Sequence, residues 1–496
     1  MTGGGEQARG RAPGSASPSG MVKNAFGFGA VATGVTETGF NYFLLIFYSQ
    51  VIGLDARLVG LAITISLLFD AIADPVVGYW SDNFRSRWGR RHPFMYAAAL
   101  PVAVSYALLW MPPQGWGQHA LFWYLLLLSI LTRIFITLYE TPSSALAPEL
   151  SYDYDERASV QSYRYFFGWS GGNVMTVLMF AIVFPLFVTA TISNGQFNRE
   201  AYVAYGAIAA GMVLVAILVS AAGTHSCIAH MRPAPPPRRM TLRIIFSEIY
   251  HSLADRSFIA LFVAAMLGAA ATGLSASLTF YFTTYFWGFT SLQVGLITLG
   301  VFVSAAIGAT IAPVVSRRMG KKNGAMVIGL IAFLGAPLPI VLRLAGLLPG
   351  NDDPSVFWLV LIANTIDTGL IICFQILTAA MIADLVDQSE LRTGRRSEGV
   401  FFAAITFVRK TVLGVGLIAA SLILTMAQFP AGAQPGEVPA DTLWRLGAWY
   451  LPTILAMWLT MIAVLSAYRL GRGDHENNLR RLAEARSASE PPPMGI

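Results

Sequence analysis

The sequence predicts an all-α polytopic membrane protein with about twelve transmembrane helices in two six-helix bundles. Of its 496 residues, 55% are hydrophobic and only 12% are charged, a composition that ordinary water-soluble domains do not have. The apolar runs are each about 20 residues or longer, which is the length a helix needs to cross roughly 30 Å of hydrocarbon. A period-two alternation of polar and apolar residues, typical of transmembrane barrels, is missing.

The first half of the chain is expected to form one bundle over residues 21–231. Residues 1–20 are rich in Gly, Ser and Pro and have no apolar signal segment, so we expect a disordered, uncleaved cytoplasmic tail. Residues 232–256 are basic and open with a Pro-rich stretch, which predicts a cytoplasmic connector between the halves. The expected spans of the first bundle are 24–54, 56–80, 92–111, 120–146, 159–188 and 202–227.

The second half is expected to form an equivalent bundle over residues 257–470. Residues 471–496 are charged and then Pro-rich, which predicts a mobile cytoplasmic tail. Six plus six spans around a central connector favour two parallel bundles that enclose a site near the middle of the membrane. The expected spans of the second bundle are 258–287, 292–316, 325–347, 356–383, 399–429 and 443–470.

Lys and Arg gather in alternate loops, which predicts the orientation of the chain. Such loops face the cytoplasm by the positive-inside rule, so both termini are expected there. The net charge of +6 is explained in this way without a nucleic-acid partner, and the Ala, Gly and Arg content favours a bacterial inner membrane. The basic loop residues are Arg85, Arg87, Arg90 and Arg91, then Arg238, Arg239 and Arg243, then Arg317, Arg318, Lys321 and Lys322, then Arg392, Arg395 and Arg396.

Two carboxylates lie within the second apolar span. Asp70 and Asp74 are four residues apart, so they project from one face of a helix about a turn apart. A carboxylate inside an apolar span is costly unless it faces a protein partner, water or an ion. The pair is therefore a candidate site for a monovalent cation or a proton.

The loop that follows this span is dense in arginine and glycine. Its arginines can form forked contacts with carboxylates at helix ends, although they also serve simply to set the topology. The loop resembles the signature loop between the second and third helices of the major facilitator superfamily, and residues 316–322 resemble a degenerate copy in the second half. The candidate gate residues of this loop are Gly78, Asp82, Arg85, Arg87, Gly89, Arg90 and Arg91.

Within that superfamily, the chain resembles the glycoside-pentoside-hexuronide:cation symporters, including melibiose permease and lysophospholipid symporters. Residues 69–75, Phe-Asp-Ala-Ile-Ala-Asp-Pro, resemble the paired-aspartate cation motif of the family. Residues 139–142, Tyr-Glu-Thr-Pro, resemble the fourth-helix acid motif. The segment from 383 to 399 resembles the loop between the tenth and eleventh helices, and Lys410 resembles the buried lysine of the eleventh helix.

The resemblance implies roles for these residues. The acids would bind the cation or carry the proton, Thr137 would donate an oxygen ligand, and Lys410 would hold the acids when no cation is bound. Interhelical ion pairing is the alternative for Glu140 and Lys410. The implied coupling residues are Asp70, Asp74, Thr137, Glu140, Thr406 and Lys410. The implied gate residues of the second half are Asp384, Asp387, Glu390, Arg395 and Glu398.

Four positions depart from the family pattern. Sodium-using members often have Asn where this chain has Ala73, so Na+ and H+ both remain candidate coupling ions. The sugar-binding members have a first-helix Asp where this chain has Gly34. An aromatic residue after the fourth-helix acid is replaced by Ser144, and an Arg before the aspartate pair is replaced by Leu67. A sugar substrate therefore does not follow from the fold alone.

The candidate substrate contacts are polar residues inside apolar spans. Glu37 lies one turn after Gly34 and is either a substitute for the missing Asp or a local hydrogen-bonding residue. Asp367 is either a substrate ligand or part of a structural ion pair. The candidate substrate residues are Glu37, Ser144, Arg164, Asp367 and Lys410.

The leading functional hypothesis is a monomeric secondary active transporter that couples uptake of a glycoside or oligosaccharide to a cation or proton by alternating access. The alternatives are symport of an amphiphile such as a lysophospholipid or glycoconjugate, and a non-transporting sensor or scramblase-like protein. The expected partners are the solute and membrane lipid. No phosphate loop, metal cluster or nucleophile elbow indicates an enzyme or a bound cofactor.

Overall fold

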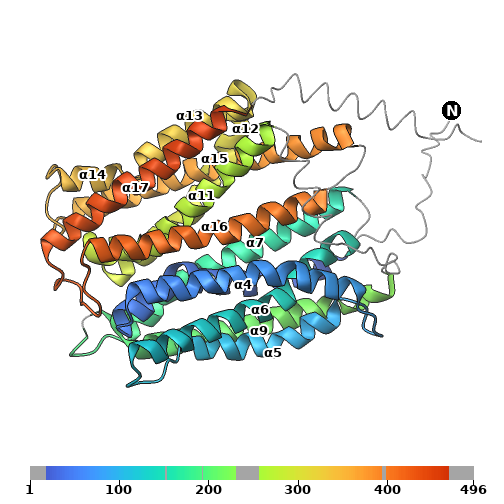
Figure 1. The fold of residues 1–496 in the computed structure, drawn as a ribbon, viewed down its shortest axis with the longest axis horizontal. Coiled ribbons are helices and arrows are strands. Elements are labelled where there is room, and N and C mark those ends of the chain that lie inside the picture. Colours follow the sequence, from blue (N-terminus) through green and yellow to red (C-terminus); the bar gives the residue numbers. More distant parts are fainter. Residues whose placement is uncertain (1–17, 151–153, 193, 231–255, 394–397, 469–496) are drawn as a thin grey trace, which may run out of the picture.

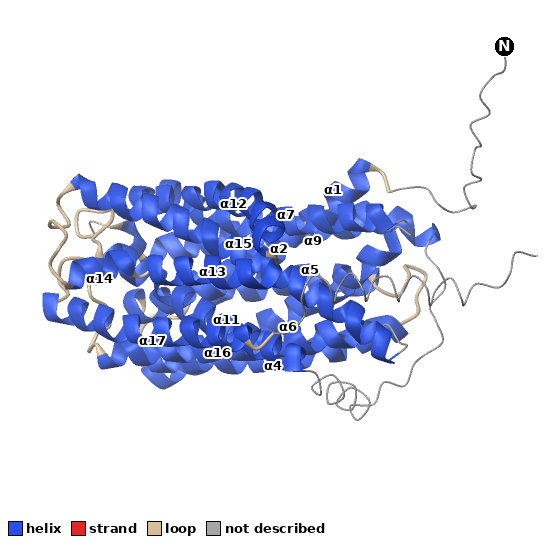
Figure 2. Ribbon diagram, turned by 90° about the horizontal axis from the view of Figure 1, so that it is seen from above, coloured by secondary structure: helices blue, strands red, loops and turns tan. Residues whose placement is uncertain are grey.

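The computed structural model describes residues 18–150, 154–192, 194–230, 256–393 and 398–468. In this part of the chain, ten helices are long and apolar enough to cross a membrane. A shorter apolar helical stretch, Val412–Met426, and the interrupted helical run over residues 20–51 account for the rest of the twelve expected spans. Figure 2 shows helices joined by loops throughout the described chain. The all-α polytopic prediction is confirmed.

The described part of the first half contains nine α-helices, several of which are segments of longer helical runs. π-Helical turns at Gly39–Phe43, Phe47–Val51 and Met179–Val183 and 3₁₀ turns at Gly195–Phe197 and Ser226–His230 adjoin them. The helices are α1 (Gly20–Phe28), α2 (Ala30–Thr38), α3 (Leu44–Ile46), α4 (Ala56–Asn83), α5 (His92–Leu109), α6 (Gln118–Leu150), α7 (Tyr154–Leu178), α8 (Phe184–Leu186) and α9 (Arg199–His225).

The second half begins at Arg256. Of the connector expected over 232–256, residues 232–255 lie outside the described chain. The ninth span is divided by Pro337 into two helices, because proline cannot continue the hydrogen-bond ladder of a helix. The helices are α11 (Arg256–Tyr281), followed by a π-turn at Phe282–Phe286, α12 (Ser291–Met319), α13 (Lys321–Gly335), α14 (Leu338–Leu344), α15 (Pro354–Thr393), α16 (Glu398–Met426) and α17 (Ala440–Ser466).

Local sequence signals set where several helices begin and end. Asp55 caps α4 by accepting a hydrogen bond from the backbone of Arg57 at 2.8 Å, and Thr290 forms a reciprocal capping box with Gln293 at the start of α12. Such caps satisfy backbone N–H groups that the helix itself cannot pair. Gly320 makes the turn between α12 and α13 with a φ of +76°. A residue with a side chain rarely adopts this backbone conformation.

The two ends of the bundle differ in charge. The loop over residues 84–91 carries four arginines, and we call this end the basic end. The six connections at the other end, which we call the neutral end, contain no Lys or Arg; they cover residues 52–55, 110–117, 187–198, 287–290, 345–353 and 427–439. In Figure 1 the neutral end lies on the left.

The halves of the chain pack against each other mainly through α4 and α16, α7 and α12, and the first helical run with α11. Figure 1 shows α7, α11 and α16 between the outer helices of the two halves. At the neutral end, the Ser49 and Tyr281 hydroxyls hydrogen-bond, Arg57 donates to Thr425 at 3.0 Å, and Thr284 donates to Gln196 at 2.9 Å. All hydrogen bonds between the halves that join two described residues lie in the half of the molecule nearer this end, so this conformer is closed there.

Candidate functional site

Asp70 lies near the middle of α4 and is 3% exposed. The hydroxyl of Thr137, on the neighbouring helix α6, donates a hydrogen bond of 2.7 Å to Asp70 Oδ1. This contact joins two residues that the sequence assigns to the coupling site, 67 positions apart in the chain. The helix-to-helix packing of α4 on α6 therefore assembles this part of the expected site.

Arg133 is the second partner of Asp70. Its Nη1 atom lies 3.5 Å from Asp70 Oδ2, and its Nε donates to the Ser66 hydroxyl at 3.1 Å. The guanidinium carbon lies 4.2 Å from the centre of the Phe40 ring, a distance at which a cation is attracted to the aromatic face. Removing one partner of such a buried ion pair typically costs about 3–5 kcal/mol because the other charge is left uncompensated.

A cavity lies beside this pair. It is small and open on one side, and its empty space, with the open mouth included, is about 310 Å³. It brings three carboxylates and one guanidinium together among small and apolar side chains. Its lining residues are Thr33, Thr36, Glu37, Phe40, Asp70, Arg133, Ile136 and Glu140.

Asp74 lies one turn further along α4 and accepts a hydrogen bond from a second threonine of α6. The Thr141 hydroxyl donates to Asp74 Oδ1 at 3.2 Å, so each aspartate of the pair contacts a threonine of α6. Ser144 donates to the backbone oxygen of Thr141 at 2.9 Å and does not line the cavity. The expected role of Ser144 in substrate binding therefore stays a prediction.

Glu140 and Arg164 connect the cavity to helix α7. Arg164 Nη2 lies 3.8 Å from Glu140 Oε1, and the two side chains are 15% and 30% exposed. An ion pair in this half-buried setting orients Glu140 without removing it from the cavity, which Glu140 lines. Two residues expected for coupling and substrate binding, respectively, are therefore direct neighbours.

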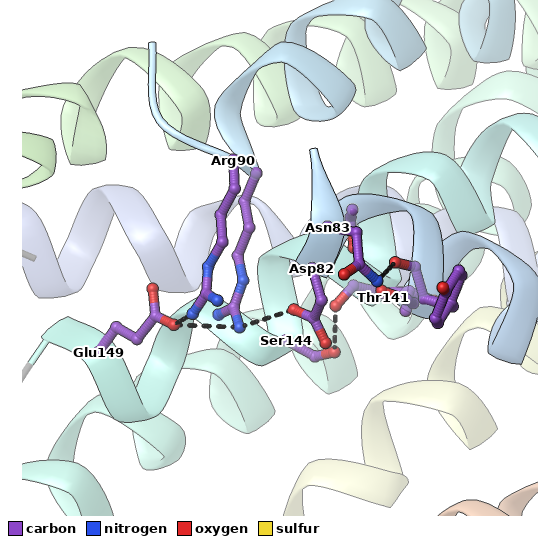
Figure 3. A network of polar contacts seen from close by, with 10 residues as sticks. Asp82, Asn83, Arg90, Thr141, Ser144 and Glu149 are labelled. Carbon is purple, nitrogen blue, oxygen red and sulfur yellow. Dashed lines mark hydrogen bonds and ion pairs between the residues drawn. The ribbon is translucent and has the colours of Figure 1, made fainter. Parts of the chain in front are cut away.

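The arginine loop forms the expected contacts with carboxylates at helix ends. Arg90 pairs with Glu149 of α6, and Arg91 lies 3.1 Å from Glu149 and 3.3 Å from Asp82. Figure 3 shows these arginines between Glu149 and Asp82. Burial lowers the pKa of Arg91, and the nearby Glu149 opposes that effect. The network fixes the basic end of α4 to α6.

The other candidate gate residues of this loop lie outside the network of Arg90 and Arg91. The φ of Gly89 is +74°, which explains a glycine at this turn. Gly78 faces α6, where a Cβ atom would lie 3.5 Å from the Thr141 methyl group. Among the described residues, Arg85 and Arg87 have no ion-pair partner within 4.0 Å. The structure therefore brings only Asp82, Arg90 and Arg91 of the expected gate set into one network.

Gly34, which stands where the sugar-binding members have an Asp, and the candidate substrate residue Asp367 do not line this cavity. A Cβ atom at Gly34 would lie 1.9 Å from the backbone oxygen of Gly168, so α2 and α7 touch there and no side chain fits. Asp367 lies against Gly335 of α13, 2.5 Å from where a Cβ atom would be, and it is not among the cavity-lining residues. Glu37, one turn after Gly34, does line the cavity.

Several expected residues lie where the structure describes no side chains. They belong to the end of α15, the following loop and the first half of α16. These residues are Asp384, Asp387, Glu390, Arg395, Glu398, Thr406 and Lys410, and their proposed roles stay predictions.

Arg133, Ser66 and Thr141 were not predicted as members of the site. Arg133 lies four residues before Thr137 and seven before Glu140, a spacing that places all three on one helical face. That spacing is visible in the sequence. The contact of Ser66 and Phe40 with Arg133 depends on how α2, α4 and α6 pack, which no local pattern reveals.

Comparisons with known proteins agree with this architecture. An uncharacterized symporter of Synechocystis, sll1374, is 24% identical and aligns over 94% of this chain and 96% of its own. The isoprimeverose transporter of Lactiplantibacillus pentosus is 23% identical over 85% of this chain and 83% of its own. The sodium-dependent lysophosphatidylcholine symporter 1 of Gallus gallus is 24% identical over 84% of this chain and 81% of its own.

Solved structures share the fold. A bacterial homologue of the iron transporter ferroportin in an inward-facing state superimposes with a TM-score of 0.62 at 12% identity, covering 90% of this chain and 98% of that one. The profile of the MFS/sugar transport protein family matches residues 25–472, which is nearly the whole chain. The chain therefore belongs to the MFS/sugar transport protein family, whose members are membrane transporters of the major facilitator fold.

Proposed function

We propose that this protein couples the uptake of a glycoside or oligosaccharide to a cation or proton gradient. The observation that carries the proposal is the buried Asp70, which contacts Thr137 and Arg133 beside a cavity near the middle of the helices. Buried ionisable groups at this depth are costly and are kept where an ion or substrate path needs them. Asp74 and Glu140 would complete the coupling site.

The conformer closed at the neutral end fits one state of an alternating-access cycle. If the basic end faces the cytoplasm, as its arginines indicate, the site would exchange with the cytoplasm in this state and with the outside after the halves rock. We place the protein in the bacterial inner membrane with both termini cytoplasmic, acting as a monomer. A relative named as the inner membrane symporter YicJ of Escherichia coli supports the membrane assignment.

A sugar is the first substrate class because the relatives include an isoprimeverose transporter and the cavity presents carboxylates, a guanidinium and the Phe40 ring. An amphiphile is the second. It is supported by the lysophosphatidylcholine symporter relative and by Tyr165 and Phe166 of α7, which are 73% and 64% exposed next to Arg164. The close contact of α2 with α7 at Gly34 also leaves no room for the first-helix Asp that the sugar-binding members have.

The experiment is a thermal-unfolding screen of the detergent-purified protein with disaccharides and single-chain phospholipids. A ligand that binds only the folded carrier raises its melting temperature. Stabilisation by one disaccharide supports the first proposal, and stabilisation by a lysophospholipid alone replaces it with the second. Each binding ligand is then tested for accumulation in proteoliposomes under a proton or sodium gradient, and equilibration without accumulation contradicts symport.

A further inference from the structure

Arg133 places a permanent positive charge among the carboxylates in the middle of the bundle. An arginine side chain does not lose its proton in proteins, so this charge is present throughout a transport cycle. Its carboxylate neighbours are Asp70, Glu37, Asp74 and Glu140.

The guanidinium is held in place by three different contacts. It pairs with Asp70 at 3.5 Å, donates to Ser66 at 3.1 Å and lies over the Phe40 ring at 4.2 Å. The residue is 7% exposed. Because Ser66 and Asp70 are one turn apart on α4, Arg133 bridges them from α6 and cannot swing away without leaving both.

These contacts occupy the Asp70 carboxylate. Oδ1 accepts the Thr137 hydroxyl and Oδ2 faces Arg133. A hard monovalent cation prefers several oxygen ligands, and at Asp70 it would lie next to a guanidinium of like charge.

We propose that Arg133 is a built-in cation that takes the place of a metal ion at Asp70 and makes this carrier independent of sodium. The inference rests on the proposed symport function and specifies it, because the coupling ion is then a proton. Asp74 and Glu140, whose contacts include Thr141 and Arg164, are the carboxylates that would carry it. Among the residues whose side chains the structure describes, the charged groups that face this region are Glu37 from α2, Asp70 and Asp74 from α4, Arg133 and Glu140 from α6, and Arg164 from α7.

The first test compares the melting temperature of the purified full chain in sodium, lithium and choline chloride at equal ionic strength. The wild type is expected to melt at the same temperature in all three salts, because no metal ion binds at Asp70. A higher melting temperature in sodium than in choline, lost in Asp70→Asn, would overturn the proposal. This measurement needs no knowledge of the substrate.

The second test removes the built-in cation. Arg133→Met keeps a long side chain without charge and is expected to gain a sodium-dependent rise of at least about 2 °C over choline. Arg133→Lys is the matched control; it keeps a positive charge and is expected to show no such rise. An Arg133→Met protein that folds and remains indifferent to sodium contradicts the proposal.

A destabilised Arg133→Met variant still gives an answer. If it folds only in sodium, the ion replaces the missing charge, as proposed. If it folds in neither salt, the double variant Arg133→Met with Asp70→Asn, which lacks both charges, provides a folded reference. The melting temperatures of the wild type in sodium and choline then decide whether the carrier is independent of sodium.

Ligand binding or uptake that requires sodium contradicts the role of Arg133 but leaves symport intact. Full proton-driven accumulation by Asp74→Asn and by Glu140→Gln contradicts the proposed coupling site and leaves sodium independence intact.

Discussion

Thr137 donates a 2.7 Å hydrogen bond to the carboxylate of Asp70, which fixes the middle of α6 to the middle of α4. Both residues are fully or almost fully buried. A hydrogen bond to an ionised group typically contributes about 1.5–3 kcal/mol. The contact therefore has the strength to help orient Asp70 within the cavity, together with Arg133 at the other carboxylate oxygen.

Replacing Thr137 tests this role. Thr137→Val keeps the shape of the side chain and removes the hydroxyl, so we expect a loss of roughly 1–3 kcal/mol of unfolding free energy and at least a tenfold loss of concentrative uptake. Thr137→Ser keeps the hydroxyl and is expected to retain most uptake. Melting curves and proteoliposome uptake measure both effects. Equal uptake by the Val variant and the wild type would show that orientation of Asp70 by Thr137 is not needed.

Gly34 is expected to tolerate no side chain. In Gly34→Ala the new Cβ would lie 1.9 Å from the Gly168 backbone oxygen, so α2 and α7 must separate, at a cost of about 1–3 kcal/mol. Gly211→Ala is the matched control in α9, where nothing lies within 4 Å; it should be neutral or stabilising by up to about 1 kcal/mol. A Gly34→Ala protein as stable as Gly211→Ala would contradict the close helix contact.

Glu149 should matter more than Asp82 in the network at the basic end. Glu149 pairs with both Arg90 and Arg91, whereas Asp82 contacts only Arg91 and its side chain is 54% exposed. We expect Glu149→Gln to cost roughly 1–3 kcal/mol and Asp82→Asn less than about 1 kcal/mol. Chemical denaturation of the two variants compares them. The reverse order of stabilities would mean that Asp82 is the main anchor of the loop.

Tyr281 is expected to help hold the neutral end closed. Tyr281→Phe removes the hydroxyl that bonds Ser49, a contact worth about 1 kcal/mol, which corresponds to a roughly fivefold shift toward conformers open at this end. Spin labels introduced at Gly117 and Gly350, where no neighbour lies within 4 Å, report the separation of the halves. A matched control is Tyr124→Phe, since the Tyr124 hydroxyl bonds the backbone within the first half. Unchanged label distances in Tyr281→Phe would contradict the closing role.

The sequence predicts the helical architecture well because each span is long and apolar, and it predicts that Asp70 and Asp74 share a helical face because they are four residues apart. Thr137 was assigned to the same site only through the family resemblance. The same logic does not place Ser144 or Asp367, whose roles in substrate binding stay predictions. Their polar character is visible in the sequence, but which neighbour each one faces depends on the packing of α6 and α15. For Arg133, the sequence shows that it shares a helical face with Thr137, because the two are four residues apart. Its contact with Asp70 could not be predicted, because that contact depends on how α4 and α6 pack.

The central claim is that ion binding at the buried carboxylates of α4 and α6, with Asp74 among them, drives solute accumulation. The most direct measurement is uptake by proteoliposomes, under a proton gradient, of whichever disaccharide or lysophospholipid stabilises the protein. Asp74→Asn, which keeps the size of the side chain and can still contact Thr141, is expected to bind and equilibrate the solute without concentrating it. Asp353→Asn, at an exposed position in the neutral-end connection before α15, is the control and should concentrate it like the wild type. Full concentrative uptake by Asp74→Asn would contradict the account.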